Sequence, residues 1–178
     1  VKLSNELSTD SIDSMELYIA EIMADAIHDV ETEAFMNGLG VTAPQGIVVG
    51  GTNVVTTAVS QQGLATVYNA VNSRYRENAS WLVAENVYLK LMALPEFIES
   101  MRSGSLFGKS VHVGYKLPND KVVFGDFSKG YCIVDRIDIP IHKSETRFME
   151  QDVTVMTAVK RTDGRVIDVA ALVVATMS

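Results

Sequence analysis

The longest regular pattern in the sequence runs from Ser11 to Met36 and predicts one long amphipathic helix. Thr9, Asp10 or Ser11 can cap its start, and Asn37-Gly38 ends it because glycine readily takes a left-handed conformation. At about 1.5 Å per residue such a helix spans about 39 Å, which is long for a chain of 178 residues. Its apolar residues recur at three- and four-residue steps: Ile12, Met15, Ile19, Ile22, Ala26 and Val30, widened by Tyr18, Met23 and Ile27.

The same segment carries a strong negative charge. Eight acidic residues and no Lys or Arg lie between Asp10 and Glu33, and residues 1–100 hold 13 acidic against 4 basic side chains. We interpret the acidic residues as the solvated face of the helix; the alternative is a surface that repels nucleic acid or meets a basic partner. This charge argues against tight, sequence-independent DNA binding, which needs clustered Lys and Arg.

The rest of the chain predicts short helices and strands, with the strands concentrated toward the C-terminus. The dipeptide Asp163-Gly164 predicts a hairpin turn. Helices are expected over residues 60–75, 85–94 and 96–101. Strands are expected over residues 47–59, 80–84, 111–115, 121–124, 131–135, 137–141, 152–160, 165–168 and 170–175. This order favours an α+β fold, in one compact unit or two small lobes.

Composition excludes several classes of protein. No run of 18 apolar residues is present, which predicts no membrane span. The one cysteine, Cys132, allows no intrachain disulfide and no zinc site that needs two thiolates. Its apolar neighbours predict a buried, unreactive thiol, since a nucleophile would need a base beside it.

Two segments are similar to phosphate-binding motifs, but neither matches its motif fully. Residues 103–110 resemble a P-loop, yet Ser103 stands where the first glycine is required, and a predicted helix precedes where a strand is needed. Gly38 and Gly40 form a G-x-G without the flanking strand and helix of a dinucleotide-binding loop. The histidines are scattered over unrelated segments, at His28, His112 and His142. We predict no catalytic, cofactor-binding or metal-binding residues.

Four blocks of the chain, in order, resemble the major capsid proteins of tailed bacteriophages, which have the Hong Kong 97-like fold. Residues 124–136 are similar to the family's G-D-F-S-x-x-Y-x-I-x-D-R segment, reading Phe-Gly-Asp-Phe-Ser-Lys-Gly-Tyr-Cys-Ile-Val-Asp-Arg. Residues 106–111 are similar to its L-x-G-x-P-V strand, with Ser110 in place of proline. Residues 13–46 resemble its spine helix and glycine-rich connector, and residues 148–169 its closing hairpin, with a turn at residues 161–166.

The resemblance implies an α+β capsid fold with two domains. A peripheral domain would comprise residues 1–40 and 125–165, with the spine helix and a long β-hairpin over residues 148–165. An axial αβ domain would comprise residues 41–124 and 166–178. The family's N-terminal arm and extended loop precede the spine helix and are expected to be absent from this chain.

The implied function is that of a structural subunit and not an enzyme. It would self-assemble into pentamers and hexamers of an icosahedral phage or prophage capsid around double-stranded DNA, in the virion and assembled in the bacterial host cytoplasm. Expected partners are further copies of the chain, other head proteins such as portal, scaffold or protease, and DNA contacted non-specifically. No cofactor and no membrane are expected.

One member of the family cross-links its subunits through a lysine, an asparagine and a catalytic glutamate. Gln151 and Ala158 stand at the last two positions, and the lysine belongs to the extended loop, so we predict no self-catalysed cross-link. Two alternatives to a phage capsid stay open. One is a bacterial nanocompartment shell protein of the same fold, and the other is a small cytosolic α+β enzyme that uses Cys132 with His112 or His142.

Overall fold

The computed structural model describes residues 1–4, 12–136, 140–144, 150 and 153–177, without the side chains of residues 3, 4, 12–16 and 54–56. The chain divides into two compact units. Unit 1 comprises Val1–Thr32 and Val134–Thr162, and unit 2 comprises Glu33–Ile133 and Asp163–Ser178. No helix within the described ranges is long and apolar enough to cross a membrane.

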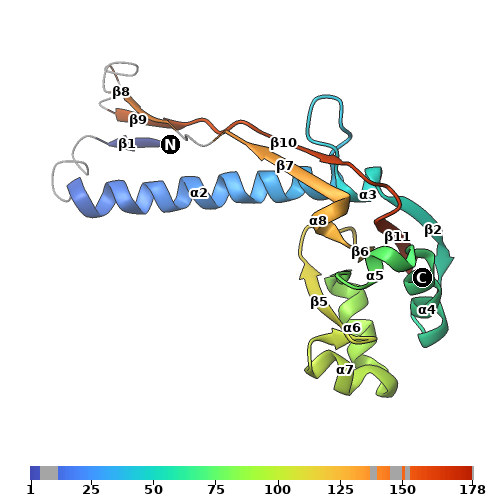
Figure 1. Ribbon diagram of the computed structural model, residues 1–178. Coiled ribbons are helices and arrows are strands. Elements are labelled where there is room, and N and C mark those ends of the chain that lie inside the picture. The colour runs from blue at the N-terminus through green and yellow to red at the C-terminus, as the bar shows by residue number, and fades with distance from the viewer. Residues whose placement is uncertain (5–11, 137–139, 145–149, 151–152, 178) are drawn as a thin grey trace. The chain divides into compact units, whose positions relative to one another are not determined.

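Unit 1 is built from helix α2 (Ile12–Asn37), which continues beyond Thr32 into unit 2, and a three-stranded sheet (Figure 1). The sheet has the order β1-β9-β8, with β9 antiparallel to both neighbours. Its strands are β1 (Lys2–Ser4), β8 (Ile141–Ser144) and β9 (Val153–Ala158). The predicted long helix is confirmed, whereas strand β1 has no counterpart among the predicted elements.

The predicted apolar face of α2 is only partly correct. Ile19 is buried, and Met23 and Ile27 continue its row as half-buried side chains. By contrast, Tyr18, Ile22 and Val30 expose 62%, 44% and 70% of their surface. The row at 19, 23 and 27 is the one that packs toward the sheet, since Ile19 and Met23 share a hollow with Ile141 and Met156. The side chains of Ile12 and Met15 lie outside the described residues.

Unit 2 contains a mixed six-stranded sheet with the order β2-β11-β6-β3-β5-β4. The β2–β11 and β3–β5 pairs are parallel, and the other pairs are antiparallel. Its strands are β2 (Thr52–Thr57), β3 (Ser80–Ala84), β4 (Ser105–Leu106), β5 (Lys109–Gly114), β6 (Lys121–Gly125) and β11 (Leu172–Met177). The last strand of the chain therefore completes a sheet begun far upstream.

The core of unit 2 lies between this sheet and its helices. Trp81 of β3 stands opposite Phe124 of β6, both fully buried, with stacked rings whose centroids are 4.2 Å apart. Helix α4 contributes the buried Leu64 and Val67. The helices of unit 2 are α3 (Ile47–Gly50), α4 (Gln61–Ala70), α5 (Ser73–Arg76), α6 (Glu85–Ala93), the short η1 (Pro95–Phe97), α7 (Ile98–Arg102) and α8 (Phe127–Gly130).

Two predicted elements are broken where the backbone turns. The helix expected over residues 60–75 ends at Ala70, because Val71 adopts an extended conformation, and Asn72 then caps the separate α5. The strand expected over residues 47–59 begins with the helical turn α3 before β2 starts at Thr52. Part of the strand expected over residues 137–141 lies outside the described residues.

The hairpin predicted at Asp163-Gly164 is wrong, because both residues lie inside strand β10 (Thr162–Val166). Strand β10 pairs with β7 (Tyr131–Asp135), and residues 155–158 of β9 pair with β8, so β9 and β10 each pair with an earlier strand. Gly164 serves close packing instead of a turn. A Cβ atom there would lie 2.4 Å from the Tyr131 hydroxyl and 2.9 Å from the Phe35 ring.

The chain crosses itself closely where α2 ends in unit 2. Gly46 donates its amide to the Gly38 carbonyl, and a Cβ atom on Gly46 would lie 2.5 Å from the Met36 carbonyl oxygen. Gln45 donates its amide to the Gly164 carbonyl and accepts a 2.7 Å hydrogen bond from the Tyr131 hydroxyl. Burial raises the pKa of Tyr131 to about 12, so this donor keeps its proton at neutral pH.

Gly164→Ala tests this crossing. We expect it to lower the free energy of unfolding by about 1–3 kcal/mol, the range of overpacking in a tight site. Urea denaturation followed by circular dichroism measures the loss. Arg165→Ala, at the exposed next position of the same strand, is the control and should stay within about 0.5 kcal/mol of the wild type. Equal stability of the two variants would show that the glycine is not needed for packing.

Candidate functional site

The P-loop-like segment is a tight hairpin in unit 2. Strands β4 and β5 pair antiparallel on either side of Phe107 and Gly108, both of which have positive φ. Lys109 donates from Nζ to the Glu77 carbonyl at 2.6 Å, and the Trp81 indole donates to the Leu106 carbonyl at 3.1 Å. The segment therefore holds the buried tryptophan in place, and its lysine is occupied by protein oxygen.

The three histidines lie on separate elements, each exposed. His28 is on α2, His112 on β5 and His142 on β8. Within the described ranges, no group of three or more His, Cys, Asp and Glu side chains could hold a metal ion. The histidines therefore contribute no assembled site.

Cys132 is exposed, which corrects the prediction of a buried thiol. It lies on β7, whose described sheet has only two strands, so the outward side of this strand is not covered by a core. Ile133 and Val134 beside it are also 49% and 66% exposed. Its thiol contacts the Ile133 carbonyl oxygen at 3.9 Å, a weak hydrogen bond to backbone and not a contact with a base.

Asp126 gives the Gly-Asp-Phe-Ser segment a structural role. Only 4% of its surface is exposed, and its Oδ1 accepts the amides of Ser128 and Lys129 and the Ser128 hydroxyl. A side-chain oxygen in this position caps the first turn of a helix. The carboxylate thus fixes α8, the single turn that carries the chain from β6 into β7.

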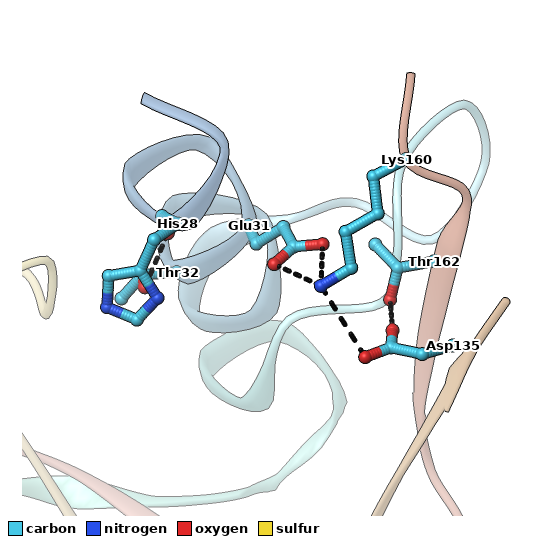
Figure 2. A network of polar contacts seen from close by, with 6 residues as sticks. All are labelled: His28, Glu31, Thr32, Asp135, Lys160 and Thr162. Atoms are coloured by element: carbon cyan, nitrogen blue, oxygen red, sulfur yellow. Dashed lines mark hydrogen bonds and ion pairs between the residues drawn. The ribbon is translucent and has the colours of Figure 1, made fainter. Parts of the chain in front are cut away.

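A polar network in unit 1 joins α2 to the strands (Figure 2). The Lys160 ammonium lies 2.7 Å from Glu31 Oε1 and 2.8 Å from Oε2, and 3.5 Å from Asp135 Oδ2. The contact with Oε2 is aligned as a hydrogen bond, and the contact with Oε1 is an ion pair. Asp135 in turn accepts a hydrogen bond from the Thr162 hydroxyl.

Lys160 and Asp135 are held in their charged forms by their partners in this network. The hydrogen bond to Glu31 is the main cause that raises the pKa of Lys160. The hydrogen bond from Thr162 is the main cause that lowers the pKa of Asp135, with the Lys160 charge adding to it. Glu31 and Lys160 expose only 15% and 19% of their side chains, so their pairing is shielded from solvent.

Sequence reasoning missed this network because its members are far apart along the chain. Glu31 and Lys160 are 129 positions apart. The one available signal was the spacing of Glu31, which continues the row of Ile19, Met23 and Ile27 at four-residue steps. An acidic residue on the buried row of a helix needs a buried cation or hydrogen-bond donor.

Unit 2 contains a second polar contact, between Tyr75 and Asp168. The Tyr75 hydroxyl donates to Asp168 Oδ2, and Oδ1 accepts the Ala170 amide at 2.9 Å. The phenol hydrogen bond is the main cause that lowers the pKa of Asp168, and the same bond raises the pKa of Tyr75. The contact ties the turn before β11 to helix α5.

These arrangements position backbone and strands, and none joins a nucleophile to a base. Of the two positions compared with the cross-linking residues, Gln151 lies outside the described residues and Ala158 ends strand β9. The absence of a cross-link stays a prediction.

Comparison with known proteins is consistent with the fold. The sequence model of the phage capsid family matches residues 1–177. The structure is similar to the capsid of an empty GTA particle computed with C5 symmetry, at 23% identity and a TM-score of 0.86, covering 100% of this chain and 71% of that one. It is also similar to a Gordonia phage Cozz chain, at 16% identity and a TM-score of 0.75, covering 100% and 68%.

A further similarity is to the holo-SrpI encapsulin complex from Synechococcus elongatus PCC 7942, at 14% identity and a TM-score of 0.69, covering 99% and 71%. No curated protein matches the sequence.

A double-mutant cycle tests the network in unit 1. Glu31→Gln and Lys160→Met should each lower the free energy of unfolding by about 1–3 kcal/mol. The first leaves Lys160 with only its longer contact to Asp135, and the second leaves the shielded Glu31 without its cation. The double variant should lose less than the sum, with a coupling of about 0.5–3 kcal/mol. Urea denaturation followed by circular dichroism measures each term. Glu21→Gln, exposed on the same helix, is the control, and additive losses would contradict the pairing.

The contact between Tyr75 and Asp168 predicts that the stability of the protein falls at acid pH. Because the folded pKa of Asp168 is lowered, its contribution to stability is present above its unfolded pKa, about 3.9, and is lost as pH falls through the folded pKa. Tyr75→Phe should shrink this dependence by returning the carboxyl toward its ordinary pKa. The urea midpoints of both proteins at pH 7 and pH 3, followed by Trp81 fluorescence, measure it. An unchanged acid loss in Tyr75→Phe would contradict the assignment.

Proposed function

Because the chain belongs to the phage capsid family, we propose that it assembles into pentamers and hexamers that close an icosahedral shell around double-stranded DNA. The single observation that carries the proposal is the match of the family over residues 1–177. Members of this family are structural proteins, and the polar contacts of this chain serve to hold its strands and helices in place.

The two units correspond in the proposal to the two domains of such a subunit. Unit 2, with its six-stranded sheet and covering helices, takes the place of the axial domain around each symmetry axis. Unit 1, with α2 and the β1-β9-β8 sheet, takes the place of the peripheral domain. A subunit divided in this way can make separate contacts within a ring and between rings.

The partners follow from the same assignment. Further copies of the chain are the main ones, joined by other head proteins such as portal, scaffold or protease during assembly in the bacterial host cytoplasm. DNA is contacted non-specifically. A formal net charge of -7 supports a wall that does not hold DNA tightly, because tight phosphate binding needs clustered cations.

A nanocompartment shell is the second candidate, supported by the structural similarity to the encapsulin complex at a TM-score of 0.69. The two functions place different demands on the interior. A phage capsid takes up DNA, whereas an encapsulin-like shell would hold protein cargo. The contents of assembled particles therefore separate them.

The test is to express the complete gene product and examine it by electron microscopy and light scattering. We expect closed shells or rings of five or six subunits. Phage-infected or prophage-induced cells should yield particles whose DNA resists nuclease until the shell is opened. Nuclease-treated opened particles serve as the control. Particles with protein cargo and no DNA would favour the nanocompartment, and a uniform monomer would contradict shell assembly.

A further inference from the structure

Two rows of side chains run along the exposed surface of α2 in unit 1. Residues four apart on a helix are neighbours, so each row is continuous. One row is apolar and exposed: Tyr18, Ile22, Ala26 and Val30. The adjacent row begins with Leu17, which is 69% exposed, and continues with the exposed acids Glu21, Asp25 and Asp29.

No residue in the described part of unit 1 pairs with Glu21 or Asp25, the first two acids of the acidic row. The carboxylates of Glu21 and Asp25 form no hydrogen bond or ion pair with any described residue. An exposed apolar row beside unpaired charges is typical of an interaction surface, because water solvates the apolar part poorly. This surface of α2 therefore has the composition of a contact that another molecule completes.

A basic hollow lies on the strand side of the same unit. Its volume is about 440 Å³, and it is lined by Arg136, Pro140, His142, Val159 and Arg161. The Arg136 amide donates to the Arg161 carbonyl at 3.1 Å, which holds the two arginine backbones side by side. Among the described side chains, none from α2 lines the hollow, so the described part of α2 does not fill it within one copy.

The basic side chains of the hollow are unpaired within the part of the chain that the structure describes. Among described residues, the side chains of Arg136, Arg161 and His142 form no hydrogen bond or ion pair. Guanidinium groups bind carboxylates through two parallel hydrogen bonds, which makes paired arginines well suited to a row of acids. Pro140 and Val159 add apolar surface, and Val159 is 48% exposed.

We infer that the hollow of one copy receives the α2 surface of a neighbouring copy, with Arg136 and Arg161 binding Glu21 and Asp25. The apolar row of the helix would cover Pro140 and Val159. The inference rests on the proposed shell function, since it names the contact by which copies join. The two surfaces lie on different parts of unit 1, so they can join copies head-to-tail in a contact that continues from copy to copy.

A second copy fits the hollow better than nucleic acid does. Tight phosphate binding needs clustered Lys and Arg, whereas the described lining of the hollow holds two arginines in a chain of formal net charge -7. The acidic row supplies carboxylates at helical spacing beside apolar side chains, which match both kinds of lining residue. Phosphate groups could pair with the arginines but offer no apolar surface to cover Pro140 and Val159.

A charge swap in the complete gene product tests the inference. The helix variant is Glu21→Lys with Asp25→Lys, the hollow variant is Arg136→Glu with Arg161→Glu, and the swap combines all four changes. We expect each reversed pair to reduce the assembled fraction at least tenfold by light scattering and electron microscopy. The swap should restore it to within about twofold of the wild type, because opposite charges face each other again.

The control variant is Glu96→Lys with Glu99→Lys. It makes the same charge change as the helix variant, at exposed positions of unit 2, and should assemble like the wild type. Circular dichroism of the unassembled chains establishes that each variant folds. If the wild type assembles and the folded helix and hollow variants do not, but the swap fails to restore assembly, the contact is overturned and the shell function stands. Normal shells from the hollow variant with less packaged DNA would assign the hollow to nucleic acid and also overturn it. A wild type that stays monomeric would overturn both.

Discussion

The close crossing of the backbone at the end of α2 is the constraint on which unit 2 depends. The amide of Gly46 reaches the Gly38 carbonyl, and the Gln45 amide reaches the Gly164 carbonyl, so the end of α2, the connector after it and the distant strand β10 share one small volume. A side chain on Gly46 or Gly164 would meet atoms closer than van der Waals contact allows. The glycines of the connector therefore set the direction in which the chain leaves the helix. They also bring β10 against Tyr131, from which β7 begins.

Elements with a local cause could be predicted from the sequence. The long helix ends at Asn37, beside the Gly38 that predicted its end, although Gly38 does not take the expected left-handed conformation. Helix α4 begins at Gln61, after Ser60, whose hydroxyl accepts the Gly63 amide. The strand at residues 80–84 and the helix that follows it are also correct, because a short apolar run and Pro95 mark their limits. Caps, breakers and short apolar runs act within a few residues, so the sequence alone carries them.

The errors concern features that depend on distant neighbours. Asp163-Gly164 is a common hairpin dipeptide, yet Gly164 is required by Phe35 and Tyr131, which no local pattern reveals. Cys132 lies among apolar residues that predict burial, but within the described residues β7 pairs with β10 alone and the thiol is exposed. The periodicity of α2 fits several overlapping apolar rows, and the sheet of unit 1 selects the row of Ile19. Which face is buried is decided by the partner and not by the helix.

The acids of α2 show how position separates the roles of one residue type. Glu31 lies on the buried row of α2, where its carboxylate is shielded from water. Without Lys160 it would be a desolvated charge with a large free-energy cost, so this ion pair must persist within each subunit. Glu21 and Asp25 lie in water, where an ion pair contributes about 0–1 kcal/mol and salt screens it. Contacts this weak can open and re-form while a shell closes, and they gain strength from repetition around it. One helix can thus be held firmly inside its subunit by a shielded acid, while its exposed acids make reversible contacts with other subunits.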